Sequence, residues 1–314
     1  MSSLPFVSII IPARNEEKFI LKCLETIVGQ DFPKENLEVL VVDGASEDKT
    51  KEIAFLWSQQ YPWIRILDNP RKFTPFGLNI GIHEARGEII VRMDAHAGYA
   101  KDYVLRCVNH LLESGADNVG GTMRTLPSEN TLTARAISLC LTSPFGAASS
   151  FRLGVAEPQE VDTVFGGCWR KSVFSRIGFF NEKMIRSQDL EFNLRLKKAG
   201  GKIMLFPDIV VEYYPQSALG KFFKHNWQDG IWSIYPLKFI KTGFKLRHYL
   251  PLIFILTLPL SVWPYSLVSL VFSLKIALRE RDARLFLLMP VVFGARHFGY
   301  GLGSLFGVVK LLAD

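Results

Sequence analysis

The chain has 314 residues, of which 48% are apolar and 24 are phenylalanine, and its formal net charge is +7. This length allows one large α/β domain plus an appendage, and the many phenylalanines indicate contact with a membrane. No acidic or basic tail is present, so nothing favours nucleic acid as a partner. Four cysteines without metal-binding spacing are expected to be reduced core thiols of a cytosolic protein: Cys23, Cys107, Cys140 and Cys168.

Two strand-then-helix units open the chain. The β-branched run at 6–12 predicts a strand, a polar loop follows, and apolar residues at 3–4 spacing predict a helix over 19–27. A second strand is predicted over 37–42, followed by a polar loop and a helix that begins near Asp48. Continuous apolar strands that alternate with helices predict a parallel sheet covered on both faces.

A third apolar strand ends in Asp94-Ala95-His96. Side chains two residues apart at a strand end can point the same way, and a carboxylate beside an imidazole suits a divalent metal that bridges a diphosphate. In parallel sheets ligands bind beyond the carboxyl ends of the strands, where Asp94 and His96 would meet the loops at 12–16 and 43–46. Three polar clusters at one edge are typical of a nucleotide-phosphate site.

The remaining elements follow from the same patterns. Gly87 is expected to cap a helix that ends near 84. Further helices are predicted at 103–112, at 132–141 within a long connector over 125–164, at 171–177 and at 189–199, and further strands at 118–123 and 203–206.

These motifs resemble the inverting family 2 glycosyltransferases with the GT-A fold. The resemblance covers about residues 5–235 and rests on segments 10–16, 42–46, 79–81, 94–96, 165–169 and 187–196. Within the family the chain is similar to the ExoA-like branch of succinoglycan biosynthesis, through segments 143–146, 161–164 and the Gln188-Asp189 form of the usual acidic pair. The resemblance implies an α/β catalytic domain with a mainly parallel central sheet over 1–215.

The resemblance also implies which residues bind the donor nucleotide: Pro12, Ala13, Asn15, Glu16, Asp43, Ser46, Asn79, Asp94 and Ala95. Asp43 lies where the family reads uracil, whose imide N–H an acceptor-only carboxylate can bind, and this favours a UDP-sugar. Glu16 matches the acid that contacts the ribose. Structural alternatives remain open for three of them. Asp43 can cap the second helix, a role for which Asp48 competes, Glu16 can be a helix first-turn acid, and Asn79 can be a helix-surface amide.

Asp94 and His96 are the expected ligands of a divalent metal, Mn²⁺ or Mg²⁺, that neutralises the leaving diphosphate. The family more often has Asp at the position of His96. An imidazole there favours Mn²⁺, because nitrogen ligands suit softer ions. The alternative is that His96 is a turn residue that is only hydrogen-bonded nearby.

Asp189 opens a helix at the place of the family's catalytic Asp, and we expect it to be the general base that activates the acceptor hydroxyl. Simple capping of that helix is the alternative and is compatible with catalysis. Gln188 replaces the common Glu beside it. The expected acceptor-side residues are Asp162, Gly166, Gly167, Glu191 and Trp227. Glu191 is expected to orient the site or bind a basic neighbour. Trp227 is expected to stack on a sugar or to lie at a membrane interface.

The C-terminal third has a different character. Between 215 and 248 six basic residues (Lys221, Lys224, Lys238, Lys241, Lys245 and Arg247) accompany a single acid and are interleaved with aromatics, which predicts amphipathic basic interfacial helices over 216–248 on anionic lipid. A core helix with a solvated basic face is the alternative. Residues 249–274 carry no charge, longer than the roughly 20 residues that span a bilayer, so 249–314 is predicted to be membrane-embedded. Pro264 could break this run into a re-entrant hairpin.

The sequence therefore predicts a metal-dependent inverting glycosyltransferase at the cytoplasmic membrane. It would move a hexose from a UDP-sugar to a polyprenyl-diphosphate-linked saccharide during polysaccharide assembly. Because no secretory signal opens the chain, the catalytic domain is expected to face the cytoplasm. Two alternatives stay open: a polyprenyl-phosphate sugar synthase, and a catalytically silent nucleotide-binding scaffold of an assembly complex.

Overall fold

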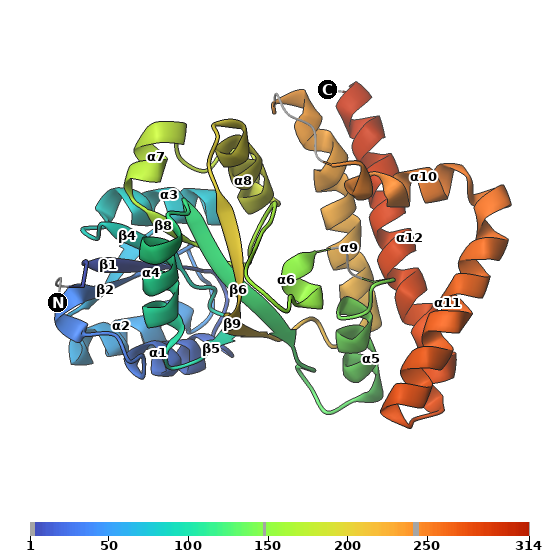
Figure 1. Ribbon diagram of the computed structural model, residues 1–314, viewed down its shortest axis with the longest axis horizontal. Helices are drawn as coiled ribbons and strands as arrows, with labels where there is room; N and C mark the ends of the chain where they lie inside the picture. Colours follow the sequence, from blue (N-terminus) through green and yellow to red (C-terminus); the bar gives the residue numbers. More distant parts are fainter. Residues whose placement is uncertain (1–3, 147–148, 241–244, 314) are drawn as a thin grey trace. The chain divides into compact units, whose positions relative to one another are not determined.

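The computed structural model describes residues 4–146, 149–240 and 245–313. The chain forms two compact units: Met1–Arg124 with Gly154–Tyr213, and Thr125–Leu153 with Tyr214–Asp314 (Figure 1). The expected boundary near 215 coincides with the third crossing of the chain between the units. Residues 125–153, which we expected inside the catalytic domain, belong instead with the C-terminal helices.

Half of the sheet in the first unit is parallel. It contains β1 (Val7–Ala13), β2 (Leu37–Asp43), β3 (Ile64–Asp68) and β4 (Ile89–Arg92) in the order β3-β2-β1-β4. The register aligns Ala13 with Asp43, and Asp43 with Asp68. The loops that leave these strands therefore meet along one edge, as the sequence predicted for the first two.

The rest of the sheet contains antiparallel pairs. β8 (Cys168–Arg170) pairs with β4 and with β6 (Asn118–Thr125), and β9 (Ile203–Tyr213) pairs with β5 (Ala97–Tyr99) and β7 (Gln159–Glu160). Within the described residues this gives a nine-stranded mixed sheet, with β8-β6-β9-β5 continuing beyond β4. The fold is the expected α/β architecture.

Helices cover both faces of the sheet. They are α1 (Ile20–Val28), α2 (Thr50–Gln60), α3 (Thr74–Glu84), α4 (Tyr103–Ser114), α7 (Ser172–Ile177) and α8 (Gln188–Lys198). The buried face of α1 shares a core with Ile9 and Ile11, whereas α3 packs through Gly81 on Ile10. Because successive strand residues face opposite sides, α1 and α3 lie on opposite faces of the sheet.

Some expected elements differ from the structure. Gly87 is not a helix cap, because α3 already ends at Glu84 and Gly87 donates its backbone N–H to Ser8 Oγ beside the start of β4. β9 is longer than the predicted 203–206, and β3, β5 and β8 were not predicted. The helix over 132–141 is confirmed.

The second unit is helical. It contains α5 (Leu132–Leu141), α6 (Ser150–Leu153), α9 (Leu219–Ile234), α10 (Leu250–Leu256), α11 (Leu258–Glu280) and α12 (Arg284–Ala313). Short 3-10 turns lie at Tyr235–Lys238 and Leu246–His248 in this unit, and at Lys34–Asn36 in the first. Its core joins Ile137 and Cys140 of α5 to Phe222, Ile276 and Phe293.

Glycines let α9 and α12 pack backbone to backbone. A Cβ on Gly303 would lie 2.0 Å from the carbonyl oxygen of Trp227, and a Cβ on Gly230 would lie 2.0 Å from that of Tyr300. Gly299 and Gly307, one turn on either side along α12, approach α9 in the same way. This small-xxx-small spacing is typical of helix pairs in membranes.

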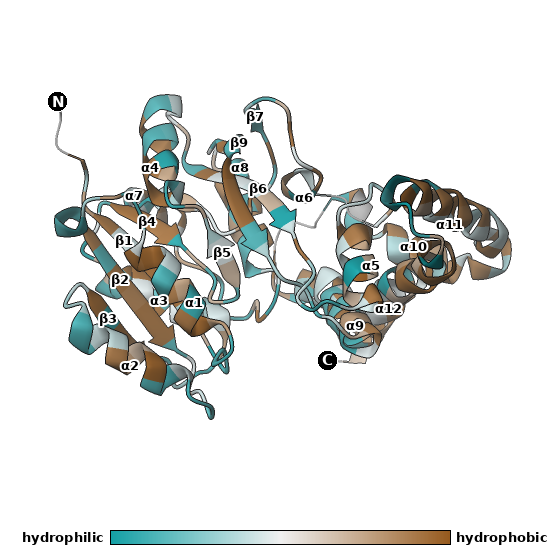
Figure 2. Ribbon diagram, turned by 90° about the horizontal axis from the view of Figure 1, so that it is seen from below, coloured by the Kyte–Doolittle hydropathy of each residue, from teal (hydrophilic) through white to brown (hydrophobic). Residues whose placement is uncertain are grey.

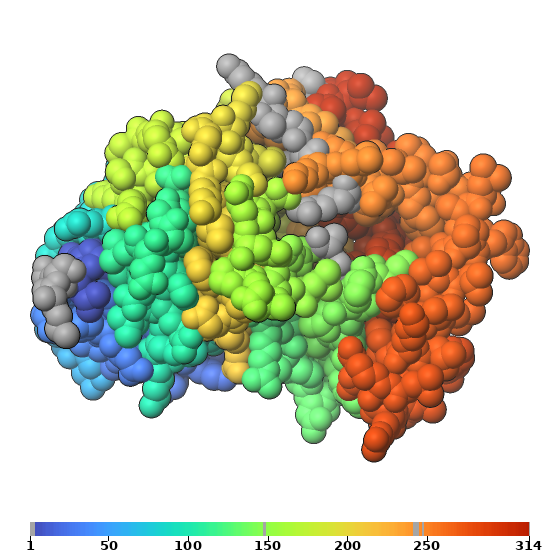
Figure 3. Space-filling model, in the orientation of Figure 1, coloured from blue at the N-terminus to red at the C-terminus, as the bar shows by residue number. Residues whose placement is uncertain are grey.

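α11 and α12 are long and apolar enough to cross a bilayer, by length and composition. Pro264 does not break α11, which continues past it; the break falls at Thr257, between α10 and α11. Leu260 and Trp263 are 82% and 79% exposed, and Figure 2 colours α11 largely as apolar. Figure 3 shows α11 as an open orange surface of this unit. Of the predicted basic residues, Lys241 lies outside the described residues; Lys221, Lys224, Lys238 and Lys245 are exposed.

At the opposite end of the parallel strands from their carboxyl edge, Glu38 is a fully buried carboxylate. It accepts hydrogen bonds from Ser8 Oγ at 2.6 Å, from the backbone N–H and Nε of Arg86, and from Arg65 Nη1. Burial raises the pKa of Glu38, but the hydrogen bonds from Ser8 and Arg86 outweigh it and leave the pKa below its ordinary value of 4.5.

Glu38→Gln is expected to destabilise the first unit by about 2 kcal/mol near neutral pH, because it removes the charge and breaks part of this network. A lowered folded-state pKa gives stability that is present above the unfolded-state pKa and is lost as pH falls through the folded-state pKa. The difference in melting temperature between wild type and variant should therefore shrink as pH is lowered from 7 towards 3. A difference that stays constant with pH would contradict this account of Glu38.

Candidate active site

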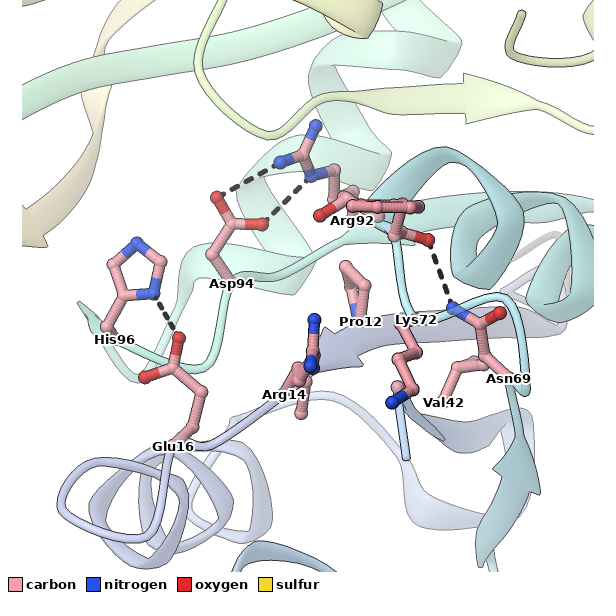
Figure 4. A pocket seen from close by; sticks show the side chains of 13 residues that line it. Pro12, Arg14, Glu16, Val42, Asn69, Lys72, Arg92, Asp94 and His96 are labelled. Atoms are coloured by element: carbon pink, nitrogen blue, oxygen red, sulfur yellow. Dashed lines mark hydrogen bonds and ion pairs between the residues drawn. The ribbon is translucent and has the colours of Figure 1, made fainter. Parts of the chain in front are cut away.

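A pocket lies at the carboxyl edge of the parallel strands (Figure 4). Its walls come from the loops that follow β1, β2, β3 and β4. The lining residues are Pro12, Ala13, Arg14, Glu16, Val42, Gly44, Asn69, Lys72, Phe73, Thr74, Arg92, Asp94 and His96. The edge that the sequence identified is therefore hollow, and Pro12, Ala13, Glu16, Asp94 and His96 lie on its wall as expected.

Hydrogen bonds tie the first two loops together. The backbone N–H of Asn15 donates to Ser46 Oγ at 3.0 Å, and Asn15 Oδ1 accepts from the backbone N–H of Glu47 at 2.9 Å. The backbone N–H of Glu16 donates to Thr50 Oγ1 at 2.7 Å. Asn15 and Ser46, both expected to bind nucleotide, do not line the pocket and instead hold the loops that do.

Strained backbone is concentrated in these loops. Asn15, Ala45 and Lys72 have φ values of 56°, 51° and 68°, and Ser187, just before Asp189, has 57°. Left-handed conformations cost non-glycine residues about 1–3 kcal/mol each and cluster at binding sites. Among the described non-glycine residues with positive φ, only Arg281 lies away from the pocket loops and the start of α8.

Arg92 and Asp94 form a buried ion pair on the pocket wall. Nε and Nη2 of Arg92 donate to the two carboxylate oxygens of Asp94, at 2.9 and 3.3 Å. The two residues are only 8% and 7% exposed. Burial lowers the pKa of Arg92, but the charges of Asp94 and of Asp189 outweigh it and raise that pKa. Arg92 therefore stays charged and links the strand end to the charge of the expected base.

His96 is held by Glu16. Its Nδ1 lies 3.0 Å from Glu16 Oε1, and its ring packs edge-on against Tyr213. Burial lowers the pKa of His96, but the hydrogen bond with Glu16 and the charges of Asp94 and Glu16 raise it overall. When neutral, an imidazole that donates from Nδ1 to a carboxylate presents the lone pair of Nε2, which is the arrangement found around metal-binding histidines.

Asp94 and His96 can hold a metal ion only if the substrate supplies further ligands. Among the described residues no group of three or more His, Cys, Asp and Glu side chains could hold a metal ion. Asp94 and His96 offer a carboxylate and an imidazole side by side. Because Mg²⁺ and Mn²⁺ prefer six ligands, the remaining ones would have to be diphosphate oxygens and water.

Asp43 and Asn79 lie behind the pocket wall. Asp43 is 2% exposed; its Oδ2 accepts from the backbone N–H of Ser46, and its Oδ1 is buried with no hydrogen-bond partner. Asp48, not Asp43, serves the start of α2, by accepting from the backbone N–H of Thr50. The amide of Asn79 is occupied by the backbone of Phe180 and by Glu182, so this residue holds α3 to that loop and lies outside the pocket. Ala95 lies in the core.

Asp189 lies in the first turn of α8. Gln188 beside it is buried. Glu191 binds a basic neighbour as predicted: Nε and Nη2 of Arg195 donate to its two oxygens, each at 2.9 Å. Arg195 also donates to the carbonyl oxygens of residues 177–179, so the pair anchors α8 rather than facing the pocket.

The other acceptor-side residues are dispersed. A Cβ on Gly167 would lie 2.3 Å from the ring of Trp169, so the protein itself occupies the space left by that glycine. Asp162 Oδ1 lies 3.8 Å from Nζ of Lys197, near the C-terminal end of α8. Trp227 packs on Phe223 and Phe306 in the second unit. None of these residues lines the pocket.

Sequence reasoning missed the basic residues of the site: Arg14, Lys72 and Arg92. A signal for Arg92 was present, since it is a charged residue inside the otherwise apolar run 89–93. Lys72 had no signal, because the preceding strand was not recognised.

Comparison with known proteins agrees with this geometry. The sequence model described as "Glycosyl transferase family 2" matches residues 8–178. A dolichyl N-acetyl-alpha-D-glucosaminyl phosphate 3-beta-D-2,3-diacetamido-2,3-dideoxy-beta-D-glucuronosyltransferase from Methanococcus voltae is 30% identical over 97% of this chain and 98% of its own length. Succinoglycan biosynthesis protein ExoA from Rhizobium meliloti (strain 1021) is 28% identical over 75% of this chain and 76% of its own length.

Solved structures share the fold. A mannosyltransferase from Pyrobaculum calidifontis, in complex with GDP-Man and Mn²⁺, aligns with a TM-score of 0.66 at 22% identity, over 99% of this chain and 88% of its own. TarS of S. aureus, residues 1–349 in complex with UDP-GlcNAc, aligns with a TM-score of 0.52 at 16% identity, over 97% and 92%. The first unit thus has the GT-A fold, and the chain belongs to glycosyl transferase family 2 and is a glycosyltransferase.

Proposed function

We propose that this glycosyltransferase moves a sugar from a nucleoside diphosphate, with inversion and with the help of a divalent metal, to a lipid-linked saccharide at the membrane. The observation that carries the proposal is the pocket at the parallel strand edge. There Asp94 and His96 stand beside the cations Arg14, Lys72 and Arg92, a setting suited to a diphosphate.

The donor is proposed to be a UDP-hexose. The buried, unpartnered Oδ1 of Asp43 behind the β2 end can accept an N–H from a base. Uracil offers one such group, and guanine offers others, so a GDP-sugar is the competing donor. The TarS structure contains UDP-GlcNAc and the mannosyltransferase structure contains GDP-Man, and both share this fold.

Asp94 and His96 would hold the metal. When bound, a Mn²⁺ or Mg²⁺ ion neutralises charge on the departing diphosphate. Glu16 would keep the proton of His96 on Nδ1 and leave Nε2 for the ion.

Asp189 is the proposed general base. It would accept the proton of the acceptor hydroxyl while that oxygen bonds to the anomeric carbon and the bond from this carbon to the diphosphate oxygen breaks. Attack opposite the leaving group gives a β-linkage from an α-linked donor. The electrostatic interaction of its charge with Arg92, one of the residues that line the pocket, supports this role.

The acceptor is proposed to be a polyprenyl-diphosphate-linked saccharide on the cytoplasmic face of the membrane. The exposed apolar side chains of α11 and α12 support this, since an exposed apolar surface of this kind is typical of contact with a membrane. The name of the Methanococcus voltae relative, which is matched over 98% of its length, includes a dolichyl-linked sugar phosphate.

Asp189→Asn is expected to reduce kcat about 10²- to 10⁴-fold, because a neutral amide cannot accept the proton, while nucleotide affinity stays unchanged. Release of UDP or GDP would be followed with a panel of donors and a membrane lipid extract as acceptor. Asp208→Asn, at a surface carboxylate bound to Arg106 and His110, is the matched control and should retain activity. Full activity in Asp189→Asn would refute the assigned base. If wild type binds UDP but releases none from any donor, the scaffold alternative would be favoured.

His96→Ala is expected to remove the metal dependence of nucleotide binding. In wild type, Mn²⁺ should tighten UDP binding about tenfold or more relative to EDTA, and in the variant this difference should largely vanish while affinity in EDTA stays the same. Glu16→Ala should act in the same direction more weakly, because it only releases the imidazole. Titration calorimetry measures both. A variant that keeps the full Mn²⁺ effect would remove His96 from the ligand set.

Membrane attachment is expected to depend on the outer face of α11. Wild-type chain should sediment with membranes and resist alkaline carbonate, whereas the double variant Leu260→Glu, Trp263→Glu should shift towards the soluble fraction, because charged groups are costly in lipid. Leu56→Glu, at an exposed leucine of α2 in the first unit, is the control. Wild-type chain that stays soluble would contradict the proposed anchoring.

A further inference from the structure

Arg92 has an unusual place in the sheet. It is the last residue of β4, whose four residues are all buried, and its own side chain is almost fully enclosed. A guanidinium cannot lose its proton in a protein, so a charge buried here must be balanced by its surroundings.

Asp94 balances only one edge of this guanidinium. Nε and Nη2 donate to Asp94, whereas Nη1, which carries two hydrogens, is buried and has no hydrogen-bond partner. Figure 4 shows this third nitrogen on the side of the guanidinium away from Asp94. The charge of Asp189 acts on Arg92, but that carboxylate does not satisfy Nη1.

A purely structural ion pair does not explain this arrangement. A buried donor left without an acceptor costs about 10-fold to 100-fold in a folding or binding equilibrium, so native structures rarely leave one. Arg92 is one of the residues that line the pocket, so a ligand bound there is the nearest candidate for the missing acceptor.

We propose that Arg92 is a donor-binding residue whose Nη1 hydrogens bond an oxyanion of the bound donor. This rests on the proposed function only in taking the donor to be a nucleotide-linked sugar. Two parts of such a donor supply this chemistry: the β-phosphate and, in a uronic acid sugar, the carboxylate. The same guanidinium then orients Asp94 with one edge and holds the donor with the other.

The test is calorimetric binding to the full chain in detergent, in EDTA and again in Mn²⁺. The probes are UDP, GDP, UDP-glucose and UDP-glucuronic acid, and the variants are Arg92→Lys and Arg92→Gln. Lysine keeps a charge for Asp94 but has no second edge, so it separates orientation of Asp94 from donor binding. Arg65→Gln is the control, since Arg65 pairs with Glu38 and Glu84 and does not line the pocket. Melting temperatures show which variants fold.

Both Arg92 variants are expected to weaken binding about 10- to 100-fold with Arg65→Gln unchanged, since a charge-assisted hydrogen bond is lost. Weakening with UDP in EDTA identifies the β-phosphate. Weakening confined to UDP-glucuronic acid identifies a sugar carboxylate. Wild-type affinity for every probe in folded Arg92→Lys would overturn the proposal and leave a structural clamp. That result would leave the assignment of Asp189 as general base intact, because this assignment fails only if Asp189→Asn stays active. A wild type that binds no nucleotide would overturn both the proposed function and the proposed role of Arg92.

Discussion

The parallel register of β1, β2 and β3 is the constraint on which the site depends. It aligns Ala13, Asp43 and Asp68, so the loops that follow these strands must share one edge. A shift of one residue would turn the apolar side chains of a strand to the wrong face, so burial on both faces fixes the register strongly. Crowding at the edge explains the hydrogen bonds between the loops and the left-handed residues Asn15, Ala45 and Lys72.

Two buried carboxylates at opposite ends of the parallel strands, Glu38 and Asp94, have a structural and a functional role respectively. Glu38 is met by four donors, and none of its partners is left buried without an acceptor. Asp94 is met by one arginine, whose Nη1 remains unsatisfied. Both pairs compensate charge, but only the second leaves binding capacity in a pocket. The two pairs therefore have comparable chemistry and different physical roles.

The sequence predicted what depends on local pattern. β1, β2, α1 and α5 are strongly periodic or continuously apolar, and the polar residues that follow β1, β2 and β4 do meet at one edge. β5 and β8 are three residues long and exist through pairing with distant strands, which a local pattern does not reveal. β3 alternates an arginine between isoleucines and was therefore not recognised as part of the parallel sheet.

The site was harder to predict than the fold, because partners distant in sequence decide which polar groups stay available. Asn79 is occupied by Phe180 and Glu182, and Asn15 by residues of the second loop. A family motif gives the position of such residues but not what they bind in the free protein. Arg92 is the opposite case, since Asp94, its neighbour in sequence, uses only part of its hydrogen-bonding capacity.

The chain leaves the first unit for the second through strands β6 and β9 of the mixed part of the sheet. β6 and β9 run up to the boundaries at Arg124 and Tyr213, beyond which the chain enters the second unit. The strands that form the donor pocket make no such connection. In the proposed enzyme, membrane attachment through α11 and α12 would therefore restrain β6 and β9 directly. It would restrain the pocket loops only through the sheet. The pocket loops, strained at Ala45 and Lys72, thus leave strands that do not lead into the second unit.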